Sequence, residues 1–202
     1  MTVASEQTSS FPSSPGRGTT PEFTSIEERI QASADDFTAC VWPAVASAFG
    51  AGALHATEGK NDPVAKQLDW LGIDYRFAPA GHPAYGISQR IGRTPYSTVT
   101  FAAQQLSRLR KVWGRPGSLV PAVHVQAYVE PGPGRTTVLR SAAVVHMGKL
   151  LTYAAQYEGT IHMNQLRGQA FHAWEFTDLY LAGVLELLLP MPSLCDPFGV
   201  GD

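Results

Sequence analysis

Residues 68–92 read LDWLGIDYRFAPAGHPAYGISQRIG, and this stretch decides the fold that the sequence predicts. A helix-like end is followed by an alternating run, Ile73–Ala78, then by the turn residues PAGHP and a second run, Ala84–Gly92. Alternation of apolar and polar residues is typical of a half-buried strand, and Pro and Gly favour a turn between two such runs. The stretch therefore predicts an antiparallel hairpin with Asp74 at the start of its first strand.

The segments on either side extend this hairpin into an α+β domain. Apolar residues from Ile26 to Phe49 recur at helical spacing after a capping Thr24 or Ser25, and Pro43 should kink or divide that helix. Downstream, further alternating runs joined by short Pro/Gly turns favour antiparallel pairing, with helical stretches between and after them. We therefore predict a mostly antiparallel or mixed central sheet flanked by helices.

The two ends of the chain differ in composition from its centre. Residues 1–24 are rich in Ser, Thr, Pro and Gly and can bury too little to offset the entropy of ordering, so we expect a disordered tail there. Residues 25–190 form the expected single domain, and residues 191–202 a loose C-terminal tail. With 202 residues and a hydrophobic content of 44%, the chain is long enough for one globular core.

Composition also bounds the location and the partners. A formal net charge of -2 excludes a protein that is basic over its whole surface, but it leaves room for a local basic patch. The N-terminus lacks the basic start and apolar run of a signal peptide, and no apolar run approaches the ~18 residues of a membrane helix. Cys40 and Cys195 lie far apart without metal-ligand spacing, so we expect reduced thiols in a cytoplasmic protein.

Polar residues of the predicted hairpin indicate chemistry on one face of the sheet. Residues two apart on a strand share a face, so Ser88 and Arg90 lie together while Gln89 lies on the other face. Pairing of the two strands brings Asp74 close to Ser88 and Arg90. Such a group can gather a divalent metal and a phosphate, because Mg²⁺ takes one or two carboxylates together with water and phosphate oxygens.

The segments LDWLGIDYRF and YGISQRI resemble the core of the PD-(D/E)XK nuclease superfamily, which includes restriction and repair endonucleases. That pattern joins a helix, a strand bearing Asp, a turn, and a strand bearing Glu, Asp or Gln two residues before Lys. The chain is also similar to small proteins of phages and mobile elements that have comparable GID and QAYV phrases. The resemblance implies a restriction-endonuclease-like core and Mg²⁺-dependent hydrolysis of phosphodiester bonds in nucleic acid.

The resemblance assigns roles to individual residues and also shows where this chain departs from the pattern. The implied site consists of the catalytic residues Asp74, Arg90 and Gln89 and the metal ligands Asp74, Asp69 and Glu58. Arg90 would clamp a phosphate while Gln89 orients it. The family's second acid falls on Ser88, or on Gln89 after a one-residue slip, and neither is a carboxylate. The family's Lys falls on Arg90, which stays protonated and cannot act as a base.

Basic residues beyond the hairpin predict contacts with a phosphate backbone. The run RLRKVWGR places four basic residues around Trp113, whose ring can stack on a base, although an ordinary solvated face is the alternative. The predicted nucleic-acid contacts are Arg93, Arg108, Arg110 and Lys111.

Three interpretations of the function stay open at this point. The first is a Mg²⁺-dependent nuclease. The second is a DNA-binding or protein-interaction module that kept the fold after losing the catalytic acid and lysine. The third is an accessory protein of a phage or mobile element that binds a host factor. The missing carboxylate on the second strand favours the last two, and the sequence indicates no oligomeric state.

Overall fold

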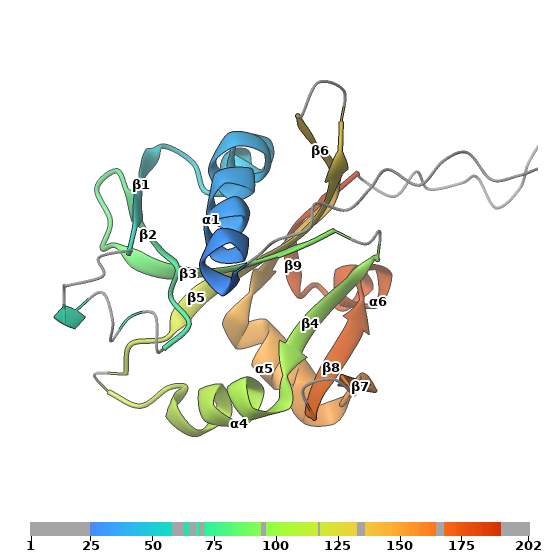
Figure 1. Ribbon diagram of the computed structural model, residues 1–202. Helices are drawn as coiled ribbons and strands as arrows, with labels where there is room; N and C mark the ends of the chain where they lie inside the picture. The colour runs from blue at the N-terminus through green and yellow to red at the C-terminus, as the bar shows by residue number, and fades with distance from the viewer. Residues whose placement is uncertain are drawn as a thin grey trace, which may run out of the picture.

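The computed structural model describes residues 25–57, 63–64, 68, 71–93, 96–116, 118–132, 136–164 and 168–190 (Figure 1). The two expected tails, residues 1–24 and 191–202, lie outside these ranges. In the part of the chain that is described, no helix is both long and apolar enough to cross a membrane.

The described strands form two sheets, one of six strands in the order β1-β2-β3-β5-β6-β9 and one of three in the order β4-β8-β7. The larger sheet contains β1 (Gly52–Ala56), β2 (Tyr75–Pro79), β3 (Tyr85–Gly92), β5 (Pro121–Pro131), β6 (Thr137–His146) and β9 (Leu185–Leu189). The smaller sheet contains β4 (Thr98–Ala102), β7 (Thr160–Asn164) and β8 (Gln169–Glu175). The larger sheet is mixed and is flanked by helices, which confirms the α+β class predicted from the sequence (Figure 1).

The predicted hairpin is present as β2 and β3, which pair in antiparallel register with Tyr75 opposite Ile87. β3 then pairs with β5 in parallel, and α4 (Ala103–Val112) lies in the connection between them. Parallel neighbours need a long crossover because the chain must return to the end from which it started. The short turns of the sequence predict antiparallel pairs, so this one parallel pair follows only from the assembled sheet.

The N-terminal helical region begins with the cap that the sequence predicts. The Glu28 backbone N–H donates to the Ser25 hydroxyl at 3.1 Å, and the Ser25 backbone N–H donates to the Glu28 carboxylate at 3.3 Å. The region continues as α1 (Ile26–Asp36), a π-helical turn (Phe37–Val41), α2 (Trp42–Val45) and a 3₁₀ turn (Ala46–Ala48). Pro43 therefore does divide the helix, with a wide turn before it, because proline cannot donate to the preceding turn.

Two apolar clusters cover the two faces of the larger sheet. On one face the cluster joins the N-terminal helical region to β2, β3, β5 and β6, with Phe37, Phe77 and Ile87 almost fully buried. On the other face it joins the sheet to α4, α5 (Met147–Gln156), α6 (Phe176–Leu181), β4 and β8. Figure 1 shows α1 on one side of the larger sheet and α4 and α5 on the other. Burial of these side chains is the main force that holds the two layers on the sheet.

The local pattern of the sequence does not predict β7 or β9. β9 is a short, almost continuous apolar run, and periodicity cannot distinguish such a run from part of a buried helix. It becomes a strand because it pairs with β6, just as β7 becomes one by pairing with β8. Both strands are decided by partners that lie elsewhere in the chain.

Candidate functional site

Asp74 lies directly before β2, one residue before Tyr75, which pairs with Ile87. Its backbone N–H donates to the carbonyl of Ile87 at 2.9 Å, and its carboxylate Oδ2 accepts from the backbone N–H of Gln89 at 2.6 Å. The carboxylate therefore satisfies an amide of β3 at the level where β2 has not yet begun. The Asp74 backbone N–H bonds to Ile87, which is already the partner of Tyr75, so the regular alternation of β2 does not extend to Asp74, and its shared face with Ser88 and Arg90 stays a prediction.

A buried hydrogen bond joins β3 to β5 beside Asp74. Ser88 pairs with His124 in the parallel register, and the Ser88 hydroxyl lies 2.8 Å from His124 Nδ1. His124 is 3% exposed, and its other ring nitrogen, Nε2, has no hydrogen-bond partner among the described residues. Burial lowers the pKa of His124 to about 3, with Arg90 acting in the same direction and Gln126 against it. The imidazole is therefore neutral at physiological pH.

Gln126 connects the larger sheet to the smaller one. It lies next to Arg90 in the register of β3 with β5 and is almost fully buried. Its side-chain oxygen accepts from the backbone N–H and from the hydroxyl of Thr100, each at 3.4 Å, and its Nε2 donates to the carbonyl of Arg90 at 3.4 Å. These bonds fix β4 above the strip formed by Ser88, Arg90, His124 and Gln126.

The Arg90 side chain extends from this strip to the smaller sheet. Its guanidinium carbon lies 4.9 Å from the centre of the Phe171 ring, and its Nη1 lies 3.5 Å from the carbonyl of Thr100. Burial lowers the pKa of Arg90, while Tyr128 acts in the opposite direction. Among the described residues no carboxylate forms an ion pair with this guanidinium. Arg90 is thus a largely desolvated cation that an aromatic face and a carbonyl surround.

The remaining members of the predicted catalytic and metal set do not converge on Asp74 in the described residues. The Gln89 side chain lies on the opposite sheet face, where its Nε2 donates to the Ser33 hydroxyl at 3.3 Å, because neighbouring residues of a strand alternate. Asp69 and Glu58 lie outside the described residues. Within those residues, no three His, Cys, Asp or Glu side chains are arranged to hold a metal ion.

Two of the predicted nucleic-acid contacts connect parts of the fold instead. Arg93 forms an ion pair with Asp36, and the other carboxylate oxygen of Asp36 accepts from the Thr137 hydroxyl at 2.7 Å. Arg110 donates to the carbonyl of Ala154 near the end of α5. Arg93 therefore connects α1 with β3, and Arg110 connects α4 with α5.

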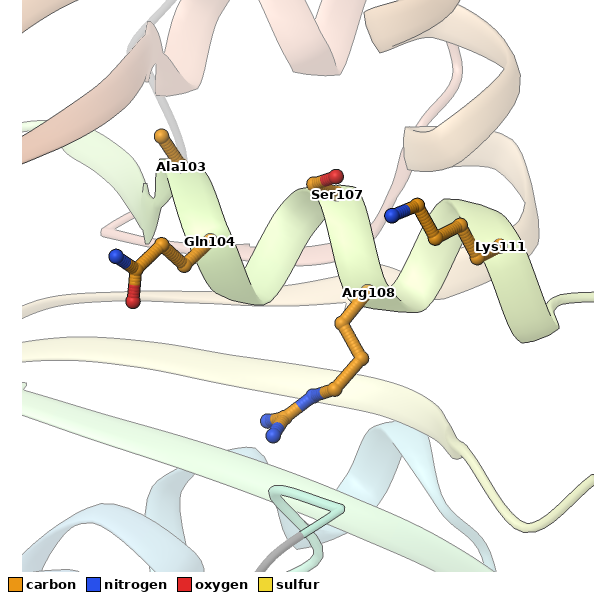
Figure 2. A pocket seen from close by; sticks show the side chains of 5 residues that line it. All are labelled: Ala103, Gln104, Ser107, Arg108 and Lys111. Carbon is orange, nitrogen blue, oxygen red and sulfur yellow. The ribbon is translucent and has the colours of Figure 1, made fainter.

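The other two predicted contacts line one hollow on α4. This shallow hollow of about 480 Å³ is lined by Ala103, Gln104, Ser107, Arg108 and Lys111. Figure 2 shows the five side chains along the helix, with Gln104 and Arg108 extending to the same side. The surface of the hollow is mostly apolar, but the residues that line it carry two cations, a hydroxyl and an amide, which are groups that hold phosphate oxygens.

The distribution of charge along the chain is a signal that analysis of the hairpin alone misses. The segment 75–129, which runs from the start of β2 to Val129 in β5, contains seven of the 15 Lys and Arg residues and none of the 17 Asp and Glu residues. These seven are Arg76, Arg90, Arg93, Arg108, Arg110, Lys111 and Arg115. A net charge of -2 for the whole chain therefore conceals a strongly basic segment that contains both the hairpin and α4.

Comparison with known proteins assigns the chain to no family. No protein-family model and no curated protein sequence matches the chain. A solved structure, described as D212, a nuclease from a fusselovirus, aligns with 81% of this chain and 95% of its own. The two share 12% sequence identity, and the TM-score is 0.31.

Proposed function

We propose that this protein binds nucleic acid through the phosphate backbone, using the acid-free basic segment 75–129. The observation that carries the proposal is the separation of charge, since seven cations lie in a segment without a single carboxylate and just one of them, Arg93, is seen to pair with an acid from outside it, Asp36, in the described residues. A local field of this kind attracts a polyanion whatever the net charge of the chain.

The desolvation of Arg90 also supports this proposal. Removing a cation from water without a neighbouring anion is unfavourable, and Arg90 has no carboxylate partner in the described residues. A phosphate oxygen at the guanidinium would supply the missing charge through a charge-assisted hydrogen bond. In the family pattern, Arg90 stands at the position of the Lys. There it could hold a phosphate without transferring a proton.

The hollow on α4 supplies a second contact for the same backbone. Arg108 and Lys111 line it together with the Ser107 hydroxyl and the Gln104 amide (Figure 2). Contacts of this type hold phosphates and carry no sequence information. The expected ligand is therefore bound with little sequence preference and with a strong dependence on salt.

The test measures binding of fluorescein-labelled single-stranded DNA, double-stranded DNA and RNA by anisotropy between about 50 and 200 mM salt. The double variant Arg108→Gln/Lys111→Gln should bind more weakly and lower the slope of log K against log salt by roughly 1.8, which is about 0.9 per lost phosphate contact. Arg140→Gln is the matched control, because Arg140 pairs with Glu130 on the β5–β6 hairpin and lies outside the segment. Absence of binding, or an unchanged slope in the double variant, refutes the proposal.

A second candidate function, Mg²⁺-dependent cleavage, is favoured by the position of Asp74. One oxygen of this carboxylate accepts from the Gln89 backbone N–H, between Ser88 and Arg90 on β3, and Mg²⁺ can use as few as one carboxylate with water and phosphate. Bound there, Mg²⁺ would activate water and stabilise the leaving oxygen. Asp74 would hold the ion and Arg90 the phosphate.

Cleavage is tested with the same nucleic acids in Mg²⁺, Mn²⁺ or a chelator. If the protein is a nuclease, Asp74→Asn abolishes metal-dependent cleavage, since an amide cannot neutralise a divalent ion. The fold should survive because the Asn side-chain oxygen can still accept from the Gln89 amide. Binding without cleavage by the wild-type protein would eliminate the nuclease candidate and leave the binding function.

A further inference from the structure

β7 is an outer strand of the smaller sheet, and one of its faces carries exposed apolar side chains. In the order β4-β8-β7 it ends the smaller sheet, and among the described residues no strand pairs with its outer side. Ile161 and Met163, two apart on one face of β7, are 54% and 61% exposed. The backbone N–H and C=O groups on such an edge are a template on which another strand can pair.

The usual protections against strand pairing are missing from β7. Edge strands of monomeric proteins commonly carry Lys, Pro, an inward charge or a bulge. β7 reads TIHMN, with no charged residue and no proline, and its register with β8 runs without a shift from Thr160 to Asn164. The strand is therefore straight, uncharged and apolar on one face, all of which favour pairing.

The order of side chains along β7 shows which partner fits. The residue types of β7 are symmetric about its central residue, His162. Ile161 and Met163 are its apolar neighbours, and the polar Thr160 and Asn164 follow on either side. We propose that β7 pairs antiparallel with β7 of a second copy of this chain, about a two-fold axis at His162. Ile161 of each copy then lies opposite Met163 of the other, and polar residues face polar residues.

Charge and hydrogen bonding agree with this symmetric pairing. No fixed charge lies on β7, so two copies meet without like-charge repulsion. Pairing also joins two three-stranded sheets into one continuous six-stranded sheet, which satisfies the outer backbone groups of both edges. Five residues per copy make a contact near or below the lower end of specific interfaces, about 1,200 Å², so the dimer should dissociate on dilution.

The first experiment measures the oligomeric state of the full chain by sedimentation velocity, without nucleic acid, over a wide concentration series. The wild type should pass from monomer to dimer as the concentration rises. Ile161→Lys and Met163→Lys should each raise the dissociation constant by about tenfold or more, because a Lys head group would have to lie in the apolar contact. Leu181→Lys on α6, where Leu181 is 85% exposed, is the control and should leave dimerisation unchanged.

The second experiment tests the two-fold axis itself. In a protein carrying Cys40→Ser and Cys195→Ser, His162→Cys places two thiols opposite each other, with Cβ atoms about 4.5–5.5 Å apart, near the reach of a disulfide. Mild oxidation should yield a covalent dimer. Thr160→Cys lies opposite Asn164 and should cross-link far less.

Three results would overturn the proposal. These are a monomer at every concentration, a dimer that both Lys variants leave intact, or cross-linking by Thr160→Cys as efficient as by His162→Cys. Melting curves of the variants show that each remains folded, so that loss of dimer is not loss of structure. Because these measurements contain no nucleic acid, their outcome is independent of the binding function proposed above.

Discussion

His124 should make the stability of this fold fall steeply in mild acid. Burial lowers its pKa from 6.5 to about 3 in the folded protein, so the unfolded chain takes up a proton that the folded chain refuses. As far as His124 is concerned, the free energy of unfolding is therefore at its full value above about pH 6.5 and decreases as the pH falls from there towards 3. Each pH unit within this window costs about 1.36 kcal/mol, so near pH 4.5 His124 alone should remove roughly 2.7 kcal/mol from the free energy of unfolding.

Urea denaturation at several pH values between about 7.5 and 4.5 measures this loss. His124→Asn removes the titrating group but keeps a side-chain oxygen that can accept from the Ser88 hydroxyl. Its free energy of unfolding should depend on pH less steeply than that of the wild type, by the amount given above. His55→Asn, at an exposed position of β1, is the control and should follow the wild type. Parallel pH profiles for the wild type and His124→Asn would refute the reasoning.

Three further predictions concern stability and binding. Arg90→Met should lower nucleic-acid affinity in anisotropy while costing less than about 1 kcal/mol in urea denaturation, because it removes a desolvated cation that pairs with no carboxylate among the described residues; a large loss of stability would contradict this. Asp36→Ala should cost about 3 kcal/mol in the same assay, since it removes the carboxylate that pairs with Arg93 and accepts from the Thr137 hydroxyl. Gly159→Ala should lower the free energy of unfolding by about 1–3 kcal/mol, which a lower melting temperature would show. Its φ is +72°, and an added Cβ would lie 2.4 Å from the Ala173 carbonyl oxygen. Gly168→Ala, also at positive φ but with nothing within 4 Å of the added Cβ, should lose less.

The hairpin shows how far local pattern alone reaches. Alternation and turn residues are properties of neighbouring positions, so they predict β2, β3, the cap at Ser25 and the shared face of Asp74, Ser88 and Arg90. Each of these depends on contacts within a few residues along the chain or across one tight turn. The structure shows the β2–β3 pairing, the Ser25 cap and alternation of Ser88 and Arg90 along β3, while the face of Asp74 stays a prediction.

The candidate site extends beyond the hairpin, and local pattern does not reach that far. His124 and Gln126 join the strip because β5 pairs with β3 in parallel through a crossover, and Thr100 and Phe171 join it because the smaller sheet packs over it. Nothing within a few residues of His124 indicates that Ser88 is its partner. The same distance effect explains why Arg93 and Arg110, which the sequence presents as free cations, are engaged with Asp36 and Ala154.

The sequence by itself determined the α+β class, the hairpin, the helical N-terminus and the acid-free basic segment, because composition and short-range periodicity encode them. Only the tertiary structure decided the parallel β3–β5 pair, the burial of His124, the contact of Gln89 with Ser33 and the position of β7 at the end of the smaller sheet as described. The physical reason is that burial and strand partners are set by contacts between distant segments. A side chain's environment, and with it the pKa of His124, exists only once those segments have packed together.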